Sequence, residues 1–466
     1  MINPAAQLER LLQKALQSHR AGRLAEAESG YRAVLSHDSE HSEALHLLGI
    51  LAAQSGRPDL AVALLQRAVA ADPASAAAHS NLGSALQSAS RLEEALSACR
   101  HAIALDASSA EAHYNLGVVL QRLERFDEAA LAFQESARLN PNAAGAFNNL
   151  GIVLEARGRI EEAVTAGKRA VALDPTSADN QINLGNSFQS GGLLDEAIVA
   201  YREAIRLQPS NASAQSNLSS ALFNAGQIDE AADAAREALR LEPNRAEASN
   251  NHGNCYRAQA LPAQALDCFR QALAHTPNSA EAQSNYLFTL NFDPQLDAQQ
   301  ILTEHRAWGS RMARLAPDRT TPHANDRSPE RRLCIGLVSP DLRNHVVGHS
   351  LRALFQVRDR QALEMVCYAN IRNSDAVTDQ LRVLADGWRN IAGQSDADVA
   401  RQIEADRIDI LFDLAVHSGG NRLALFARKP APIQVSYLGY PGTTGLDAID
   451  YRLSDAYIDP VGEDSD

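Results

Sequence analysis

The sequence predicts an all-α array of paired helices followed by one smaller α/β lobe. Three features carry this prediction: a strict 34-residue repeat, a composition rich in alanine and leucine with only 5% aromatic residues, and a change to short apolar runs near the C-terminal end. Of the 466 residues, 45% are hydrophobic, which is enough apolar mass for a sizeable core. This composition argues against general disorder, and the length predicts two to four domains.

The charge balance and the cysteines restrict the class of protein. Lys and Arg number 43 against 57 Asp and Glu, a net charge of -14, which argues against a general nucleic-acid binder. No apolar run approaches the length that spans a bilayer, and the N-terminal segment lacks the apolar region of a secretory signal, so we expect no membrane partner. The five cysteines are scattered and without zinc-ligand spacing, which indicates reduced thiols in a cytoplasmic protein.

Alanine and glycine recur in register through the first part of the chain. The alanines stand 34 residues apart, without an insertion, at Ala27, Ala61, Ala95, Ala129, Ala163, Ala197, Ala231 and Ala265. Glycines at the same spacing include Gly49, Gly83 and Gly117. Small residues let two helices cross closely, where larger side chains would force the backbones apart. A helix–turn–helix unit of this length is the tetratricopeptide repeat, and about eight of them predict a superhelix with a concave face over residues 1–290, including a capping helix.

A third residue type repeats in the same register. Asparagine recurs every 34 residues on the first helices, at Asn81, Asn115, Asn149, Asn183, Asn217, Asn251 and Asn285, and the first five of these stand directly before a leucine. Asparagine is a poor residue for a helix interior, so packing alone does not require it. We expect this asparagine ladder to line the groove and to hold an extended peptide by its main chain. The alternative is that the amides only bond neighbouring helices and stabilise the stack.

The repeat pattern ends after Asn285 and a second composition begins. Residues 291–330 predict one connecting helix and a polar linker, with a domain boundary near residue 328. Beyond it, short apolar runs alternate with helical stretches, which predicts a parallel sheet with helices on both faces over residues 331–466. The expected strands are Leu333–Ser339, Met365–Ala369, Ile410–Val416 and Ile433–Gly439.

Candidate site residues follow these strands, because sites in such sheets lie at the carboxyl ends of the strands. Asp341, Asn344 and His345 follow the first strand, where a helix begins, and His345 is the expected proton carrier. His345 and His349 have a spacing that also occurs in zinc sites, but no third ligand is evident, so we expect no metal. In the structural alternative, Asp341 caps the helix and the histidines only pack.

Two glycine-rich loops follow the third and fourth strands. His417 begins the first loop, and the second runs from Leu438 and Gly439 to Gly442 and Thr443. Glycine lets main-chain amides approach a ligand closely, although neither loop matches a standard nucleotide-binding pattern. On spacing alone these loops are either part of a site or ordinary turns.

Taken together, these segments resemble a known family. An asparagine-laddered repeat array followed by SPDLRNHVVGH and RKPAPIQVSYLGYPGTTGLDAIDYRLSD resembles the bacterial type of protein O-linked N-acetylglucosamine transferase, glycosyltransferase family 41. The resemblance implies the first, Rossmann-like half of a GT-B fold. It also implies transfer of N-acetylglucosamine from UDP-GlcNAc to Ser or Thr of proteins in the repeat groove, with no cofactor or metal.

The same resemblance assigns roles to the candidate residues. Asp341, Asn344 and His345 match a motif that borders the donor sugar and its diphosphate, and Leu438 and Gly439 match a turn close to the transferred sugar. We expect His345, His417, Leu438, Gly439, Gly442 and Thr443 to bind the donor. Val346 and Val347 stand where animal members have Pro-Thr, so the hydroxyl contact is not expected here.

The resemblance also implies a second catalytic lobe that this chain does not contain. That lobe supplies most donor contacts in the family, so we expect residues 1–466 alone to be inactive or nearly so. Two other functions remain open: a peptide-binding repeat scaffold with a degenerate lobe, and a related transferase that uses another nucleotide sugar.

Overall fold

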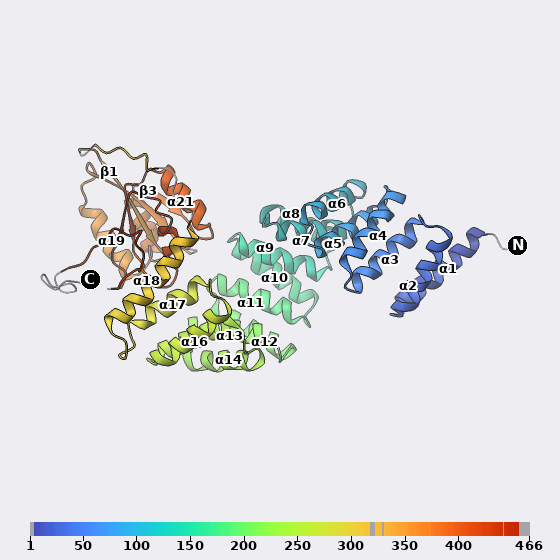
Figure 1. The fold of residues 1–466 in the computed structure, drawn as a ribbon, viewed down its shortest axis with the longest axis horizontal. Coiled ribbons are helices and arrows are strands. Elements are labelled where there is room, and N and C mark those ends of the chain that lie inside the picture. The colour runs from blue at the N-terminus through green and yellow to red at the C-terminus, as the bar shows by residue number, and fades with distance from the viewer. Residues whose placement is uncertain (1–3, 317–321, 329, 372, 441, 456–466) are drawn as a thin grey trace. The chain divides into compact units, whose positions relative to one another are not determined.

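The protein forms two compact units, Met1–Pro209 and Ser210–Asp466 (Figure 1). The structure, a computed structural model, describes residues 4–316, 322–328, 330–371, 373–440 and 442–455. Residues 456–466 of the expected lobe lie outside this description. Within the described residues no helix combines the length and the apolar character needed to cross a membrane.

The first unit consists of helices. They are α1 (Pro4–Arg20), α2 (Leu24–His37), α3 (Ser42–Gln54), α4 (Pro58–Ala71), α5 (Ala76–Ser88), α6 (Leu92–Leu105), α7 (Ala110–Arg122), α8 (Phe126–Leu139), α9 (Ala144–Ala156), α10 (Ile160–Leu173), α11 (Ala178–Ser190) and α12 (Leu194–Leu207). The second unit begins with α13 (Ala212–Asn224), α14 (Ile228–Leu241), α15 (Ala246–Ala258), α16 (Pro262–His275), α17 (Ala280–Leu290) and α18 (Ala298–Leu315). Each odd-numbered helix from α1 to α15 packs against the even-numbered helix that follows it, as the repeat predicts.

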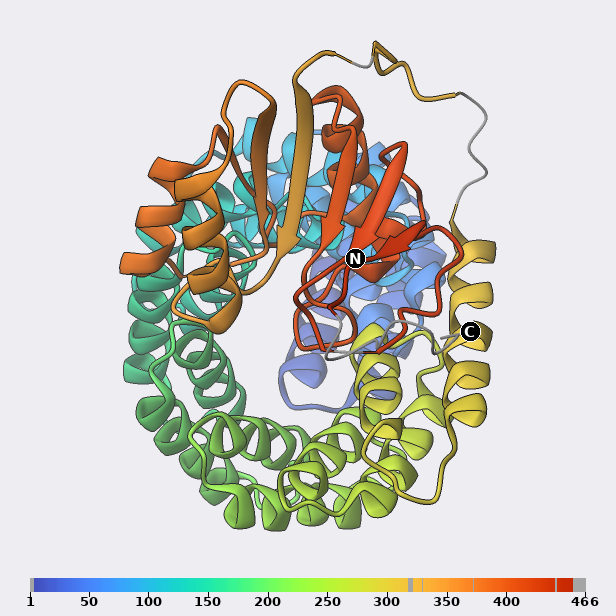
Figure 2. The same cartoon turned by 90° about the vertical axis from the view of Figure 1, so that its left-hand side faces the viewer.

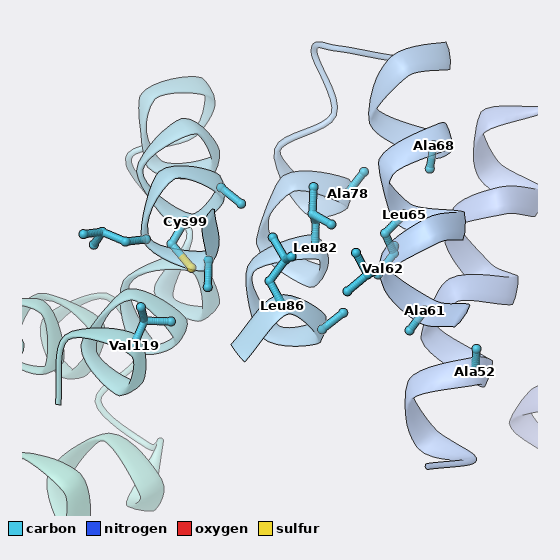
Figure 3. Packing of buried hydrophobic residues seen from close by; sticks show 14 of the residues in the cluster. Ala52, Ala61, Val62, Leu65, Ala68, Ala78, Leu82, Leu86, Cys99 and Val119 are labelled. Carbon is cyan, nitrogen blue, oxygen red and sulfur yellow. The ribbon is translucent and has the colours of Figure 1, made fainter. Parts of the chain in front are cut away.

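The small residues of the repeat have a steric reason. The repeated alanines are buried, and the glycines of the first helices face the residue four positions after each alanine. A Cβ on Gly49 would come within 2.6 Å of Leu65, and one on Gly117 within 2.7 Å of Phe133. Glycine therefore makes room for a large side chain on the partner helix. Figure 3 shows part of this buried core, with Leu65 of α4 and Leu82 and Leu86 of α5.

A further periodic feature sets where the first helices begin. The N-cap side chain accepts a hydrogen bond from the backbone N–H three residues later at His41, Ser75, Ser109, Ser177, Asn211 and Ser279. Such caps satisfy N–H groups that the helix itself leaves without a partner. The same position is occupied by Ala143 and Arg245, which make no side-chain cap bond.

The α/β lobe is built on one parallel sheet with the order β3-β2-β1-β4-β5-β6. Its strands are β1 (Leu333–Ser339), β2 (Leu363–Ala369), β3 (Gly387–Asn390), β4 (Ile410–Asp413), β5 (Ile433–Ser436) and β6 (Tyr451–Arg452). Figure 2 shows the strands of the lobe side by side. Four strands were expected and are confirmed, although β4 and β5 end earlier than expected. The expectation missed β3 and β6, which are short edge strands without an apolar run.

Helices cover both faces of the sheet, as expected. On one face α19 (Val346–Val357) and α20 (Ala376–Leu384) pack on Leu337 and Cys367. On the other, α21 (Asp396–Ala405) and α22 (Leu423–Phe426) share a core with Trp308 of α18. The connecting helix α18 is therefore part of the packed lobe.

Candidate functional site

The strand order places the candidate site at one point of the sheet. The chain winds outward from β1 in one direction through β2 and β3, and in the other through β4, β5 and β6. Ligands of open parallel sheets bind at such a switch point, outside the carboxyl ends of the strands. The loops after β1, β2 and β4 meet there. The Asn370 side chain donates to the Gly420 carbonyl over 2.9 Å, and a Cβ on Gly420 would lie 3.0 Å from Pro340.

His345 is the N-cap of α19. Its Nδ1 accepts from the Val347 N–H at 3.3 Å and lies 3.9 Å from an oxygen of Asp341. The alternative in which Asp341 caps this helix is therefore wrong, because the helix begins after His345, too far along the chain for the Asp341 carboxylate. A neutral ring whose Nδ1 accepts carries its proton on Nε2. In this arrangement the half-exposed His345 offers a hydrogen-bond donor to a ligand.

Asn344 ties the loop after β1 to a neighbouring helix. Its backbone N–H donates to Asp375 over 2.6 Å, and its side-chain oxygen bonds Nε2 of His349 at 3.0 Å. Hydrogen bonds from the Asn344 and Thr378 N–H groups lower the pKa of the Asp375 carboxyl. His349 is thereby engaged with an amide. Across the part of the chain that the structure describes, no three His, Cys, Asp or Glu side chains are grouped to hold a metal ion.

His417 lies inside the lobe. Its side chain is buried, its Nε2 bonds the Thr444 carbonyl at 3.1 Å, and its ring meets Trp308 edge to face at 4.7 Å. Burial lowers the pKa of His417 to about 3, so the ring is neutral at physiological pH. The structure thus places His417 beneath the second glycine-rich loop, where it holds that loop against α18.

Asp413, at the end of β4, is a buried carboxyl that the sequence analysis did not single out. It accepts from the N–H groups of Ala415 and Val416 at 3.2 and 2.9 Å. Burial nevertheless raises the pKa of Asp413 to about 7. The buried hydroxyl of Tyr440 has no hydrogen-bond partner among the described residues, and burial followed by the charge of Asp413 raises its pKa. The signal in the sequence was an aspartate at the carboxyl end of an apolar strand, ILFD.

Leu438 and Gly439 follow β5 in a tight turn. Leu438 has a φ of 62°, a conformation that costs energy for a branched side chain, and the two residues line a pocket of about 300 Å³ with Tyr437 and Tyr440. A Cβ on Gly439 would come within 2.5 Å of Val416, so glycine allows the loops after β4 and β5 to touch.

Gly442 and Thr443 line a different pocket, of about 640 Å³, with Arg306 and Arg452. Ser436 at the end of β5 lines both this pocket and the smaller one. Neither pocket is lined by Asp341, Asn344 or His345. The structure therefore brings the β5 turn residues into two adjoining hollows and sets the β1 motif apart from them, at the same edge of the sheet.

The ladder asparagines are half-buried. Where a hydrogen bond of the side-chain NH₂ group is described, its partner lies on the preceding first helix. Their Nδ2 atoms bond residues 35 positions earlier at Asn81, Asn115, Asn149, Asn183, Asn251 and Asn285. This contact is the stacking role foreseen as the alternative. The oxygens of Asn81, Asn115, Asn183 and Asn251 have no described donor, so peptide binding through them stays a prediction.

Comparison with known proteins assigns both parts of the chain. Residues 310–466 match the model of glycosyl transferase family 41, and residues 12–178 and 182–246 match tetratricopeptide repeats. A probable UDP-N-acetylglucosamine–peptide N-acetylglucosaminyltransferase SPINDLY of Solanum lycopersicum is 38% identical over 178 residues, 37% of this chain and 19% of that protein. A UDP-N-acetylglucosamine–peptide N-acetylglucosaminyltransferase of Caenorhabditis elegans is 33% identical over 132 residues, 28% of this chain and 12% of that protein.

A solved structure resembles a larger part of the chain. A mutant of the O-GlcNAc transferase of Thermobaculum terrenum is 34% identical, with a TM-score of 0.57, over 60% of this chain and 53% of that one. The matched regions thus span about a fifth of the length of the SPINDLY relative and about half of the solved chain.

Proposed function

We propose that this chain, which belongs to glycosyl transferase family 41, functions as part of a protein O-GlcNAc transferase. The enzyme would move N-acetylglucosamine from UDP-GlcNAc to Ser or Thr of acceptor proteins. The observation that carries the proposal is the match of residues 310–466 to the family, joined to a repeat array whose first helices present one amide per repeat. Five free cysteines support the cytoplasm as its compartment, and the resemblance of its motifs supports a bacterial source.

The proposed roles follow from the geometry. His345 offers its Nε2 proton to an oxygen of the donor, where a fixed hydrogen-bond donor stabilises negative charge that develops as the diphosphate leaves. Asn344 and Asp341 hold the loop that carries this histidine. Leu438, Gly439, Gly442 and Thr443 line hollows that we assign to the donor. His417 supports this wall from beneath. The chemistry requires neither cofactor nor metal.

His345→Ala tests the donor role in the full product of the gene that encodes this chain. We expect the variant to lower the rate of transfer from UDP-GlcNAc by a factor of about 10² or more, as for other positioned donors. Transfer is measured by mass spectrometry of modified Ser and Thr. The matched control is His101→Ala, which removes an exposed histidine of α6 far from the lobe in sequence. Equal turnover of His345→Ala and the control would remove His345 from the site.

The ladder has its own test. Replacing Asn115 and Asn183 by alanine removes two oxygens that accept no described bond and two amide groups that bond the preceding repeat. We expect weaker use of protein acceptors and unchanged hydrolysis of UDP-GlcNAc, because only the acceptor would contact the ladder. A loss of both activities in equal proportion would show that the change acts through the fold of the array. Robust transfer by residues 1–466 alone would contradict the expected need for a second lobe.

A further inference from the structure

A polar cavity of about 530 Å³ lies within the second unit, between the first helices of its repeats and the α/β lobe. Two ladder asparagines, Asn251 and Asn285, line it from α15 and α17. The loop Ser418–Asn421 after β4 lines it from the lobe, and Asn421 donates to the hydroxyl of Ser284 at 3.0 Å. The cavity therefore joins the end of the asparagine ladder to the switch point of the sheet.

Arg257 is the cation of this cavity, and the groups that contact its guanidinium are neutral. Its guanidinium donates to Asn285 Oδ1 at 3.1 Å and to Asn254 Oδ1 at 2.9 Å. The rings of Phe269 and Phe288 lie 5.8 and 5.4 Å from its central carbon. Within the described residues it has no ion pair. By contrast, Arg245 at the N-cap of the same helix and Arg270 of α16 each pair with a carboxylate three residues away.

The charge of Arg257 is incompletely compensated. Burial lowers the pKa of Arg257, and the nearby charge of Glu281 opposes this effect without cancelling it. Glu281 also lines the cavity, but it is exposed and accepts a hydrogen bond from Asn250 at 3.0 Å. Of the five N–H groups of a guanidinium, two are used here on amide oxygens, and the remaining ones fit a carboxylate.

The repeat register shows that this cation is specific to one unit. Arg257 stands six residues after its ladder asparagine. The residues at the same place in the preceding first helices carry no positive charge and are Gln87, Gln121, Glu155, Gln189 and Phe223. Stacking of the array therefore does not require arginine at this place.

We propose that Arg257 selects an acidic side chain, aspartate or glutamate, in the peptide acceptor. This inference rests on the proposed function, in which an extended peptide lies along the ladder. Asn251 Oδ1, which accepts no described bond, would accept a hydrogen bond from a backbone N–H of that peptide. The neighbouring guanidinium would donate hydrogen bonds to the carboxylate of the peptide. An acceptor anchored in this way lies beside Ser418–Gly420, at the carboxyl edge where the transfer site is proposed.

The test measures binding of short synthetic peptides to the 466-residue chain by fluorescence anisotropy. Each peptide has a central serine in an alanine and glycine background and carries Glu, Gln or Lys at one position at a time. We expect that at one position Glu binds about tenfold more tightly than Gln, as for a charge-assisted hydrogen bond. Arg257→Gln should abolish this preference, and Arg257→Lys should keep part of it.

Arg270→Gln is the matched control, because it removes the same charge from an exposed arginine of α16 that pairs with Asp267. It should keep the full preference for Glu. Thermal unfolding of each variant establishes that it is folded. If Arg257→Gln does not fold, Arg257→Lys takes its place in the comparison. Equal binding of Glu and Gln peptides to the wild type, or a preference that survives in Arg257→Gln, would overturn the inference and leave the peptide groove standing. If no peptide binds, the proposed acceptor groove is wrong, and this inference falls with it.

Discussion

The repeat array and the α/β lobe reach their folds through contacts of different range. Within each compact unit of the array, helices pack on their neighbours in the sequence, and ladder amides bond residues one repeat away, as Asn183 does with Asn148. In the lobe, β1 pairs with β2 on one side and with β4 on the other. Ile335 therefore lies beside Met365 and also beside Ile410, which is farther away along the sequence. A repeat array is stabilised piece by piece, whereas a parallel sheet forms only as a whole.

The largest test of this difference removes one buried ring from each region. Phe133 of α8 and Phe355 of α19 are both fully buried, so Phe→Ala at either site should cost about 4 kcal/mol of local stability. For Phe133→Ala we expect faster amide exchange in the repeats next to α8 alone. For Phe355→Ala we expect it across all strands of the sheet. Hydrogen exchange with mass spectrometry measures both.

Leu131→Ala is the control for these variants, because Leu131 lies on the same helix as Phe133 and is 66% exposed. It should change stability by less than about 0.5 kcal/mol. If Phe133→Ala increased amide exchange throughout the lobe, the loss of stability in the array would not be confined to neighbouring repeats, and the proposed difference between the two regions would be wrong.

The second prediction concerns pH and two buried groups of the lobe. The pKa of His417 is about 3 in the folded protein, against an ordinary value of 6.5. Below pH 6.5 the unfolded state therefore binds a proton that the folded state does not, and the free energy of unfolding falls as the pH falls. Asp413 has a pKa of about 7 when folded and 3.8 ordinarily, so between pH 7 and 3.8 the folded state holds the extra proton and stability rises as pH falls. The two effects oppose each other between about pH 6.5 and 4.

His417→Gln removes one side of this balance. Relative to the wild type, its free energy of unfolding should rise by about 1.4 kcal/mol for each pH unit lowered between 6.5 and 4.5. Urea unfolding of the lobe at a series of pH values, followed by tryptophan fluorescence, measures the difference. The two curves should run parallel above pH 7, where neither folded nor unfolded histidine is charged. Parallel curves throughout would mean that His417 is not shielded from protons in the folded protein.

The smallest effects are expected at the caps of the array. Ser109 caps α7 by accepting the Ala112 N–H at 3.2 Å, and Ala143 at the equivalent place of α9 makes no such bond. Ser109→Ala should cost about 1 kcal/mol, and Ala143→Ser should gain a similar amount. Both are read from thermal unfolding. A stabilisation by Ser109→Ala would show that the backbone of this turn, rather than its side chain, sets where the helix begins.

Much of the fold could be predicted from sequence because its signals are local. The 34-residue register gave the helix pairs, and the apolar runs gave four of the strands. The edge strands β3 and β6 escaped prediction because partly exposed strands such as Gly387–Asn390 need no apolar run. For the site, the motif around His345 could be recognised in the sequence, but the cap it forms could not, since that depends on where α19 begins.

The sequence by itself determined the period of the array, the placement of its small residues and the class of the lobe, because each depends on spacing along one chain segment. Only the tertiary structure decided that His417 is buried against Trp308 and that Arg257 faces the loop after β4. Those neighbours come from segments far apart in sequence. Burial and unpaired charge are properties of the packed surroundings and leave no periodic trace in the chain.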